Sequence, residues 1–181
     1  MPTITEKKLT FSFPEGWVVN KYDEQSFYRQ KVQKCRGTAA VDILALSETD
    51  LFLIEVKDFR KHRIENKKRF QHAELADEFA QKVRDTIASL YGAYRWHNSI
   101  FTPFCHYLYV NLKKEERRDI RRITAILFLE EDMPPVKARD FKVVHRYLRE
   151  NMQMKLKFLQ IRCQVYNKKT LPKKFGWHVM G

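Results

Sequence analysis

The stretch from Ala40 to Arg60, AVDILALSETDLFLIEVKDFR, decides the fold because it contains two apolar runs with a polar segment between them. Val41 to Leu46 and Leu51 to Lys57 are rich in β-branched and large apolar residues, which favours strands. Residues 47–50 are polar and turn-like, so we expect a β-hairpin. The apolar runs hold three charged residues: Asp42, Glu55 and Lys57.

The register of this hairpin determines which charged side chains meet. Side chains alternate along a strand, so Glu55 and Lys57 share one face. A loop of residues 48–49 places Asp42 opposite Glu55, whereas a loop of residues 49–50 places Asp42 opposite Lys57. A three-residue loop without a bulge puts Asp42 on the other face. Either two-residue loop therefore brings the three charged groups together.

Two opposed carboxylates need a compensating cation. Opposed Cβ atoms lie roughly 5 Å apart, so Asp42 and Glu55 would repel each other without one. Oxygen donors without Cys or His suit a hard ion such as Mg²⁺ or Mn²⁺. Lys57 would add a fixed positive charge beside the ion. The alternative is a buried or half-buried ion pair between the lysine and one acid.

The order Asp42, then Glu55-x-Lys57 at the end of an apolar strand, resembles the PD-(D/E)xK nuclease superfamily. Val41 stands where the family name has Pro. The segments EVKDFR and ELADEFAQKVRDT are similar to uncharacterised bacterial members, and this similarity extends over approximately residues 20–92. The resemblance implies a restriction-endonuclease-like fold.

The resemblance also implies roles for individual residues. The metal ligands would be Asp42, Glu55, the carbonyl of Val56 and an acid of the first helix, Glu24 or Asp23. An N-cap or first-turn role is the ordinary alternative for those two helix acids. The catalytic residues would be Asp42, Glu55, Lys57 and, on the helix that follows the hairpin, Lys82. Lys57 would orient or deprotonate the attacking water, or stabilise developing charge.

The function implied by the resemblance is that of a metal-dependent nuclease that hydrolyses DNA phosphodiester bonds with Mg²⁺ or Mn²⁺. The competing function is a non-catalytic nucleic-acid-binding or complex-assembly module that keeps the fold. The chain has five glycines and no phosphate-cradling glycine cluster, which excludes a P-loop NTPase and a dinucleotide-binding fingerprint. Its six histidines lack metalloprotease or zinc-finger spacing.

The charge distribution favours a polyanionic partner. The net charge is +13, whereas residues 1–50 balance seven basic against seven acidic groups. A solvated basic surface or an anionic membrane is the alternative, and DNA is the partner that we expect. The phosphate contacts are predicted in the basic loop after the hairpin, at Arg60, Lys61, Arg63, Lys67, Lys68 and Arg69.

The whole chain, residues 1–181, is predicted to form one α/β domain with a mixed central sheet flanked by helices. The expected strands are 8–13 (an edge strand), 105–112, 123–130 and 160–166, and the expected helices are 22–34, 71–92 and 141–156. No apolar run is long enough to span a membrane and no leader is evident, so we expect a cytoplasmic protein without membrane contact. Besides the monomer, a homodimer stays an alternative. Trp17, Trp96 and Trp177 are expected to pack rather than to stack on bases.

Overall fold

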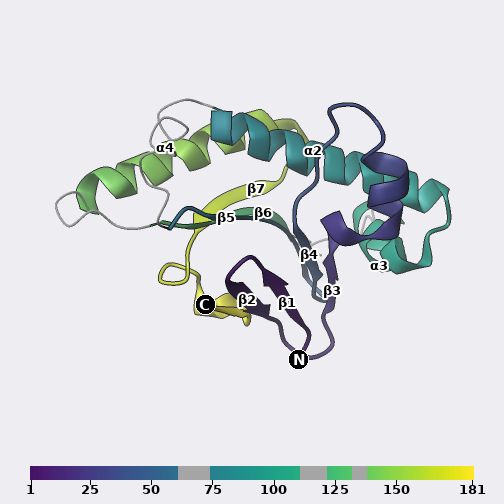
Figure 1. The fold of residues 1–181 in the computed structure, drawn as a ribbon, viewed down its shortest axis with the longest axis horizontal. Helices are drawn as coiled ribbons and strands as arrows, with labels where there is room; N and C mark the ends of the chain where they lie inside the picture. Colours follow the sequence, from purple (N-terminus) through teal and green to yellow (C-terminus); the bar gives the residue numbers. More distant parts are fainter. Residues whose placement is uncertain (61–73, 111–121, 132–137) are drawn as a thin grey trace, which may run out of the picture.

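The computed structural model describes residues 1–60, 74–110, 122–131 and 138–181. Two long helices cover one face of a five-stranded sheet, and a smaller sheet lies against the other face (Figure 1). Within these ranges no helix combines the length and the hydropathy that a membrane crossing requires. The prediction of a mixed α/β fold is confirmed.

The large sheet has the strand order β3-β4-β5-β6-β7. Its strands are β3 (Val18–Lys21), β4 (Ile43–Leu46), β5 (Asp50–Asp58), β6 (Arg122–Glu130) and β7 (Arg162–Tyr166). The pairs β3-β4 and β4-β5 are antiparallel, whereas β5-β6 and β6-β7 are parallel. Parallel neighbours need a long crossover. The helix α2 (Glu74–Arg95) lies between β5 and β6 in the chain, and α4 (Ala138–Leu156) lies between β6 and β7.

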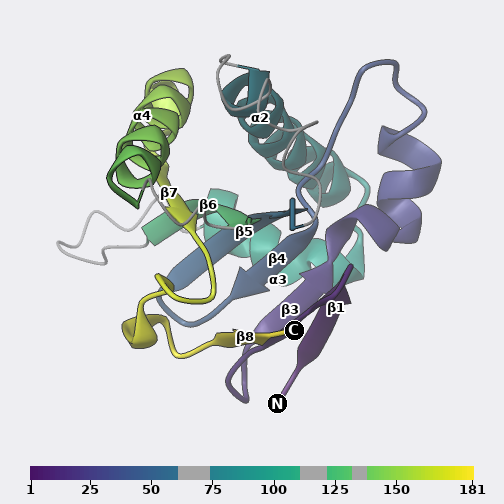
Figure 2. The same ribbon diagram turned by 60° about the vertical axis from the view of Figure 1, so that its left-hand side comes forward.

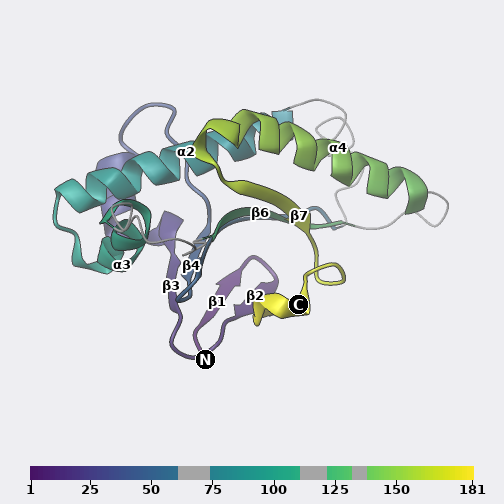
Figure 3. The ribbon, with the colours of Figure 1, turned by 180° about the vertical axis from the view of Figure 1, so that it is seen from behind.

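Both crossover helices lie on one face of the sheet, as Figures 2 and 3 show from two further sides. The helix α2 has buried apolar residues at helical spacing, among them Leu75, Phe79, Val83 and Leu90. They belong to one core together with every second residue of the strands, such as Leu53, whose side chains point to the α2 face of the sheet. Glu55 and Lys57 lie two and four positions after Leu53 on β5, so their side chains point to the same face of the sheet as Leu53, toward α2.

The small sheet has the order β1-β2-β8, with strands β1 (Thr3–Glu6), β2 (Leu9–Ser12) and β8 (His178–Met180). The second core lies between this sheet and the large one. It includes Phe11, Phe13 and Trp177 together with Phe52 and Val56, whose side chains point to the opposite face of the large sheet from that of Leu53. The C-terminal segment is therefore part of the fold.

Three expectations about secondary structure were wrong, and three short strands were missed. Residues 22–34 form a 3₁₀ helix, Tyr22–Glu24, and a π-helix, Tyr28–Val32, rather than one helix. Residues 105–110 are helical, because α3 (Thr102–Cys105) continues into a π-helix, His106–Val110. A short apolar run does not distinguish a strand from a buried helical turn. The predicted edge strand, β2, is central in its sheet, and the very short strands β1, β3 and β8 were not foreseen.

Candidate functional site

The hairpin register places Asp42 opposite Glu55. Ile43 pairs with Ile54 and Leu44 with Leu53, so the same register continued by one residue opposes the two acids. The amide of Ser47 donates to the carbonyl of Asp50 at 2.9 Å, which leaves residues 48–49 as the loop. This is the first of the two registers that gather the three charged groups.

The carboxylate of Glu55 is buried and has one oxygen without a partner. Glu55 is 1% exposed, and its Oε1 accepts from Nζ of Lys82 at 2.7 Å and lies 3.2 Å from Nζ of Lys57. Within the described residues, Oε2 is buried and accepts no hydrogen bond. Buried carboxylate oxygens without a donor are rare in folded proteins. The arrangement therefore leaves a position at which a cation or a water can bind Oε2.

Asp42 also keeps one oxygen free. Its Oδ2 accepts from the amide of Val56 at 2.6 Å, and Asp42 is 8% exposed. In the part of the chain that the structure describes, Oδ1 accepts no hydrogen bond. Burial raises the pKa of Asp42, and the amide of Val56 counteracts part of this effect. The hairpin thus presents two buried acids, each with one oxygen available.

The two lysines predicted beside the acids are both present there. Nζ of Lys57 bridges Glu55 and Glu78, which lies 2.5 Å away on α2. Burial alone would lower the pKa of Lys82, but the adjacent Glu55 carboxylate raises it overall. The side chains of Lys57 and Lys82 are only 14% and 19% exposed. The ion-pair alternative for Lys57 is therefore realised in this structure, beside an acid pair that retains free oxygens.

Glu55 is expected to make stability depend on pH. Burial, and then the charge of Asp42, raises the pKa of Glu55 to about 7. The folded chain therefore holds a proton that the unfolded chain releases near pH 4.5, so the stability from this group is lost as pH rises from about 4.5 to about 7. The loss is at most roughly 3 kcal/mol.

Urea unfolding across this pH range checks the sign. We expect the free energy of unfolding to fall toward pH 7, and the fall to be markedly smaller in Glu55→Gln, which cannot ionise. Glu150→Gln, which changes an exposed acid on α4, is the matched control and should keep the slope. A slope as steep in Glu55→Gln as in the native chain would contradict this assignment.

The structure pairs Glu24 with a lysine rather than with the acid pair. Glu24 is exposed, and its Oε1 lies 2.9 Å from Nζ of Lys21, which also contacts Glu6. Asp23 is the acid of this 3₁₀ helix that is coupled to the site, because burial and then the charge of Asp42 raise its pKa to about 6. Of the two acids that the sequence leaves open, Asp23 is therefore the one whose charge is coupled to Asp42, and a metal contact by either acid stays a prediction.

Lys7 is a site residue that the sequence did not reveal. It lies in the turn between β1 and β2 with a φ of 55°, and its Nζ donates to the carbonyl of Val56 at 3.4 Å. This is the carbonyl for which the family resemblance implies a metal contact. A lysine from the small sheet thus reaches the same strand end as Lys57 and Lys82.

The donor set fits a hard divalent cation in type. Asp42, Glu55 and the Val56 carbonyl offer oxygen alone, and Glu55 has an orphaned oxygen. Among the described residues no group of three Asp, Glu, His or Cys side chains can hold a metal ion. Two carboxylates and a carbonyl would therefore be the protein's whole contribution, with water completing the coordination sphere.

The basic loop predicted to bind phosphate lies almost entirely outside the described residues. Lys61, Arg63, Lys67, Lys68 and Arg69 belong to the range 61–73. Arg60 is described, and its guanidinium forms an ion pair with Asp58, whose Oδ2 is 2.6 Å from Nη2. Arg60 thus already has a carboxylate partner beside the site.

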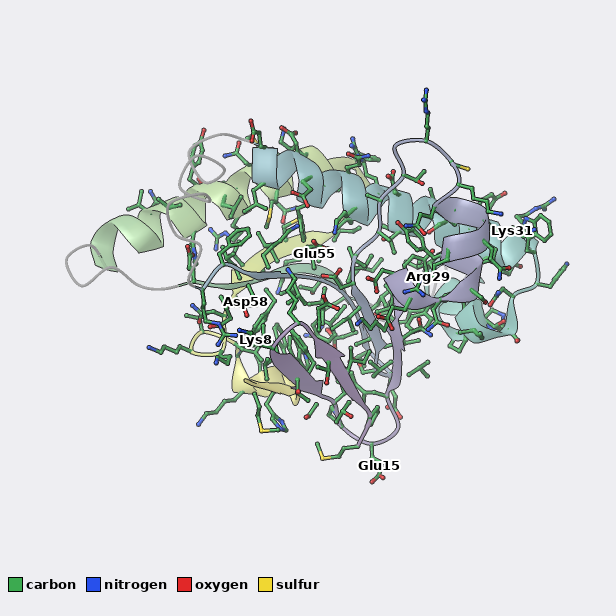
Figure 4. All side chains as sticks on the ribbon, in the orientation of Figure 1. Lys8, Glu15, Arg29, Lys31, Glu55 and Asp58 are labelled. Atoms are coloured by element: carbon green, nitrogen blue, oxygen red, sulfur yellow. The ribbon has the colours of Figure 1, made fainter. Side chains whose placement is uncertain are left out.

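A second basic surface lies on residues 29–36. Arg29, Lys31, Lys34 and Arg36 are exposed, and the segment 29–36 contains no acid. The end of α2 also carries exposed aromatic residues: Tyr91 is 53%, Tyr94 42% and Trp96 65% exposed. Nζ of Lys31 lies 4.4 Å from the centre of the Trp96 ring, whereas Tyr91 and Tyr94 contact Tyr109. We call these seven residues the basic–aromatic face. Figure 4 shows Arg29 and Lys31 on the side of the molecule where α2 ends.

The chain that follows residues 29–36 is fixed to α2 close to Lys82. The side chain of Gln81 donates to the carbonyl of Gly37, the amide of Ala39 donates to Asp85 at 3.0 Å, and that of Val41 donates to Thr86 at 3.1 Å. These three residues of α2 lie within four positions of Lys82. The basic–aromatic face and the acid pair therefore share one supporting helix.

Comparisons with known proteins revise the expected activity. No family model and no solved structure matches the chain. A cysteine–tRNA ligase of Neisseria meningitidis is 36% identical over 119 residues, a match that covers 51% of this chain and 17% of the ligase. The chain thus spans only a small part of the length of this relative.

This similarity corrects the expectation of a DNA nuclease. The matched relative is named a ligase, which joins molecules, and its name specifies tRNA rather than DNA. The assignments to nuclease and hydrolase are overturned on that ground. The short Asp and Glu-x-Lys motif describes the acid pair correctly in space, but three residues on a hairpin also suit other uses of a buried charge cluster.

Proposed function

We propose that this chain is an RNA-binding module that acts with tRNA aminoacylation, and that its basic–aromatic face holds the RNA. The observation that carries the proposal is the exposure of four cations on residues 29–36 and of three aromatic rings at the end of α2, two segments that meet where Lys31 contacts Trp96. Cations neutralise backbone phosphates and release counterions. Exposed rings stack on unpaired bases, which is the usual way in which proteins hold the loops and ends of RNA.

The preference for RNA over DNA rests on the relative. Its name is that of an enzyme that uses tRNA, and tRNA has the single-stranded loops and the 3′ end that stacking rings require. Because the chain covers 17% of that ligase, we assign to it a binding role within such a system and not the ligase reaction. The chain would serve an enzyme by holding its RNA.

Mg²⁺ or Mn²⁺ at the acid pair completes the proposal. Asp42, Glu55 and the Val56 carbonyl would hold the ion, which would offset the repulsion between the two buried carboxylates. When bound, the ion would supply positive charge to an RNA phosphate. When no ion is present, the ammonium groups of three lysines would offset the negative charge of the two carboxylates: Lys57, Lys82 and Lys7. We also propose that the large sheet, with α2 and α4 on one face, is a restriction-endonuclease-like arrangement used for binding.

A binding competition tests this function. Fluorescence anisotropy of a labelled bacterial tRNA, measured in Mg²⁺ at several salt concentrations, should show saturable binding that weakens steeply with salt. Unlabelled tRNA should compete roughly tenfold or more better than duplex DNA with the same number of phosphates, because the duplex offers no unstacked bases. Equal competition by the duplex, or no binding of tRNA, would refute the proposal.

A further inference from the structure

A polar pocket of about 460 Å³ lies at the opposite end of β5 from the acid pair. Its lining includes Trp17, Glu48, Phe52, Arg162, Lys174 and Phe175. The side chains of Phe52 and Glu55 point to opposite faces of the sheet, so the pocket opens on the sheet face away from α2. No residue of the acid pair or of the basic–aromatic face lines it. The pocket is thus a separate site.

The apolar part of the pocket is aromatic. The Trp17 ring stacks on Phe52 with centroids 5.7 Å apart and planes at 6°, and Phe175 meets Phe52 edge to face at 5.1 Å. Phe52 is buried, whereas Trp17 and Phe175 are partly exposed. The two exposed rings offer surfaces for a planar ligand, held in place by a buried ring.

The charged groups of the pocket do not all neutralise one another. Arg122 is engaged with Asp50 at 2.8 Å, and Glu15 lies 3.7 Å from the N-terminal ammonium group of Met1. Arg162, Lys174 and Glu48 form no ion pair within the described ranges. One pocket therefore combines aromatic surface, two available cations and one available carboxylate.

We propose that this pocket binds a nucleoside 5′-phosphate. The base would lie against Trp17 and Phe175, the phosphate would bind Arg162 and Lys174, and the ribose hydroxyls would donate to Glu48. The volume is within the usual range of small-molecule sites, roughly 300–1,000 Å³. This site is independent of the proposed RNA-binding face, and its ligand is either a free nucleotide or the 5′-phosphorylated end of an RNA.

Calorimetric titration of the full chain with AMP, CMP, GMP and UMP tests the proposal. We expect at least one of these nucleotides to bind. Inorganic phosphate and the matching nucleoside should each bind at least roughly tenfold more weakly than that nucleotide, because each uses only part of the pocket. A 5′-phosphorylated RNA tetranucleotide distinguishes the two sources: tighter binding than the mononucleotide identifies an RNA end, and weaker binding identifies a free nucleotide.

Variants locate the binding. Arg162→Gln and Lys174→Gln should each weaken nucleotide binding roughly tenfold. Trp17→Leu should remove the difference in affinity between the nucleotide and inorganic phosphate, because the base loses its ring contact. Lys173→Gln, an exposed lysine next to Lys174 that does not line the pocket, is the matched control. No binding up to about 10 mM, or equal binding by Arg162→Gln and the native chain, would overturn the proposal.

Discussion

Replacing Arg29, Lys31, Lys34 and Arg36 together with Gln is expected to weaken tRNA binding roughly a hundredfold at moderate salt. All four side chains are exposed, on a segment without acids. Each cation that contacts a phosphate releases counterions, so the slope of log affinity against log salt should become shallower by up to about three units. Anisotropy titrations of the same labelled tRNA at four or five salt concentrations measure both quantities.

The control for this variant removes the same charge elsewhere. Lys8, Lys157, Lys169 and Lys173 are all exposed and lie on other segments, so their joint replacement with Gln also lowers the net charge by four. We expect this control to change the affinity by only a few-fold, through the general field of the protein. An equal loss in both variants would show that total charge, and not the basic–aromatic face, attracts the RNA.

Loss of Mn²⁺ binding in Glu55→Gln is the second large effect that we expect. A ligand at about a hundred times its dissociation constant stabilises the folded state by about 2.7 kcal/mol, so Mn²⁺ should raise the melting temperature of the native chain measurably. Glu55→Gln and Asp42→Asn each remove a carboxylate from the donor set and should abolish this shift. Thermal unfolding with and without Mn²⁺ measures it, at pH 8 where Glu55 is ionised.

Glu24→Gln is the matched control for the metal experiment. Glu24 forms an exposed ion pair with Lys21 and does not contact Glu55, so this variant should keep the full shift. A shift that persists in the double variant Asp42→Asn, Glu55→Gln would place the ion elsewhere. No shift in the native chain would leave Lys57 and Lys82 as the permanent cations of a structural cluster.

The sequence was sufficient for the centre of the sheet. Alternation along the hairpin placed Glu55 and Lys57 on one face, and an even loop placed Asp42 on that same face, because both follow from strand geometry alone. The structure decides between the two even registers and sets Asp42 opposite Glu55. Lys82 was reached through the family resemblance, on a helix that the apolar period of the sequence predicts. Lys7 could not be reached, since it meets the site through packing of the small sheet against β5. Glu78 lies one turn before Lys82 on α2, and the sequence did not assign it a contact with Lys57.

The basic–aromatic face was missed from the sequence because the charges of residues 1–50 were counted together. The first fifty residues carry seven basic and seven acidic groups, so their composition looks neutral. In the structure, four of those cations lie on one segment, while Asp42 is buried and Glu6 is engaged by Lys21. Trp96 was expected to pack, but α2 ends at Arg95 and leaves the ring exposed beside Lys31. The run of cations at 29–36 is visible in the sequence, whereas its exposure beside Trp96 depends on tertiary structure.

Photo-crosslinking tests the central claim, that the basic–aromatic face holds RNA, most directly. The full chain bound to tRNA in Mg²⁺ is irradiated, the RNA is digested, and the crosslinked peptides are identified by mass spectrometry. We expect crosslinks at Trp96, Tyr94 or Tyr91, because stacked rings lie against bases, and we expect excess unlabelled tRNA, but not duplex DNA, to suppress them. Crosslinks confined to other parts of the chain, with the peptide around Trp96 unmodified, would contradict the account.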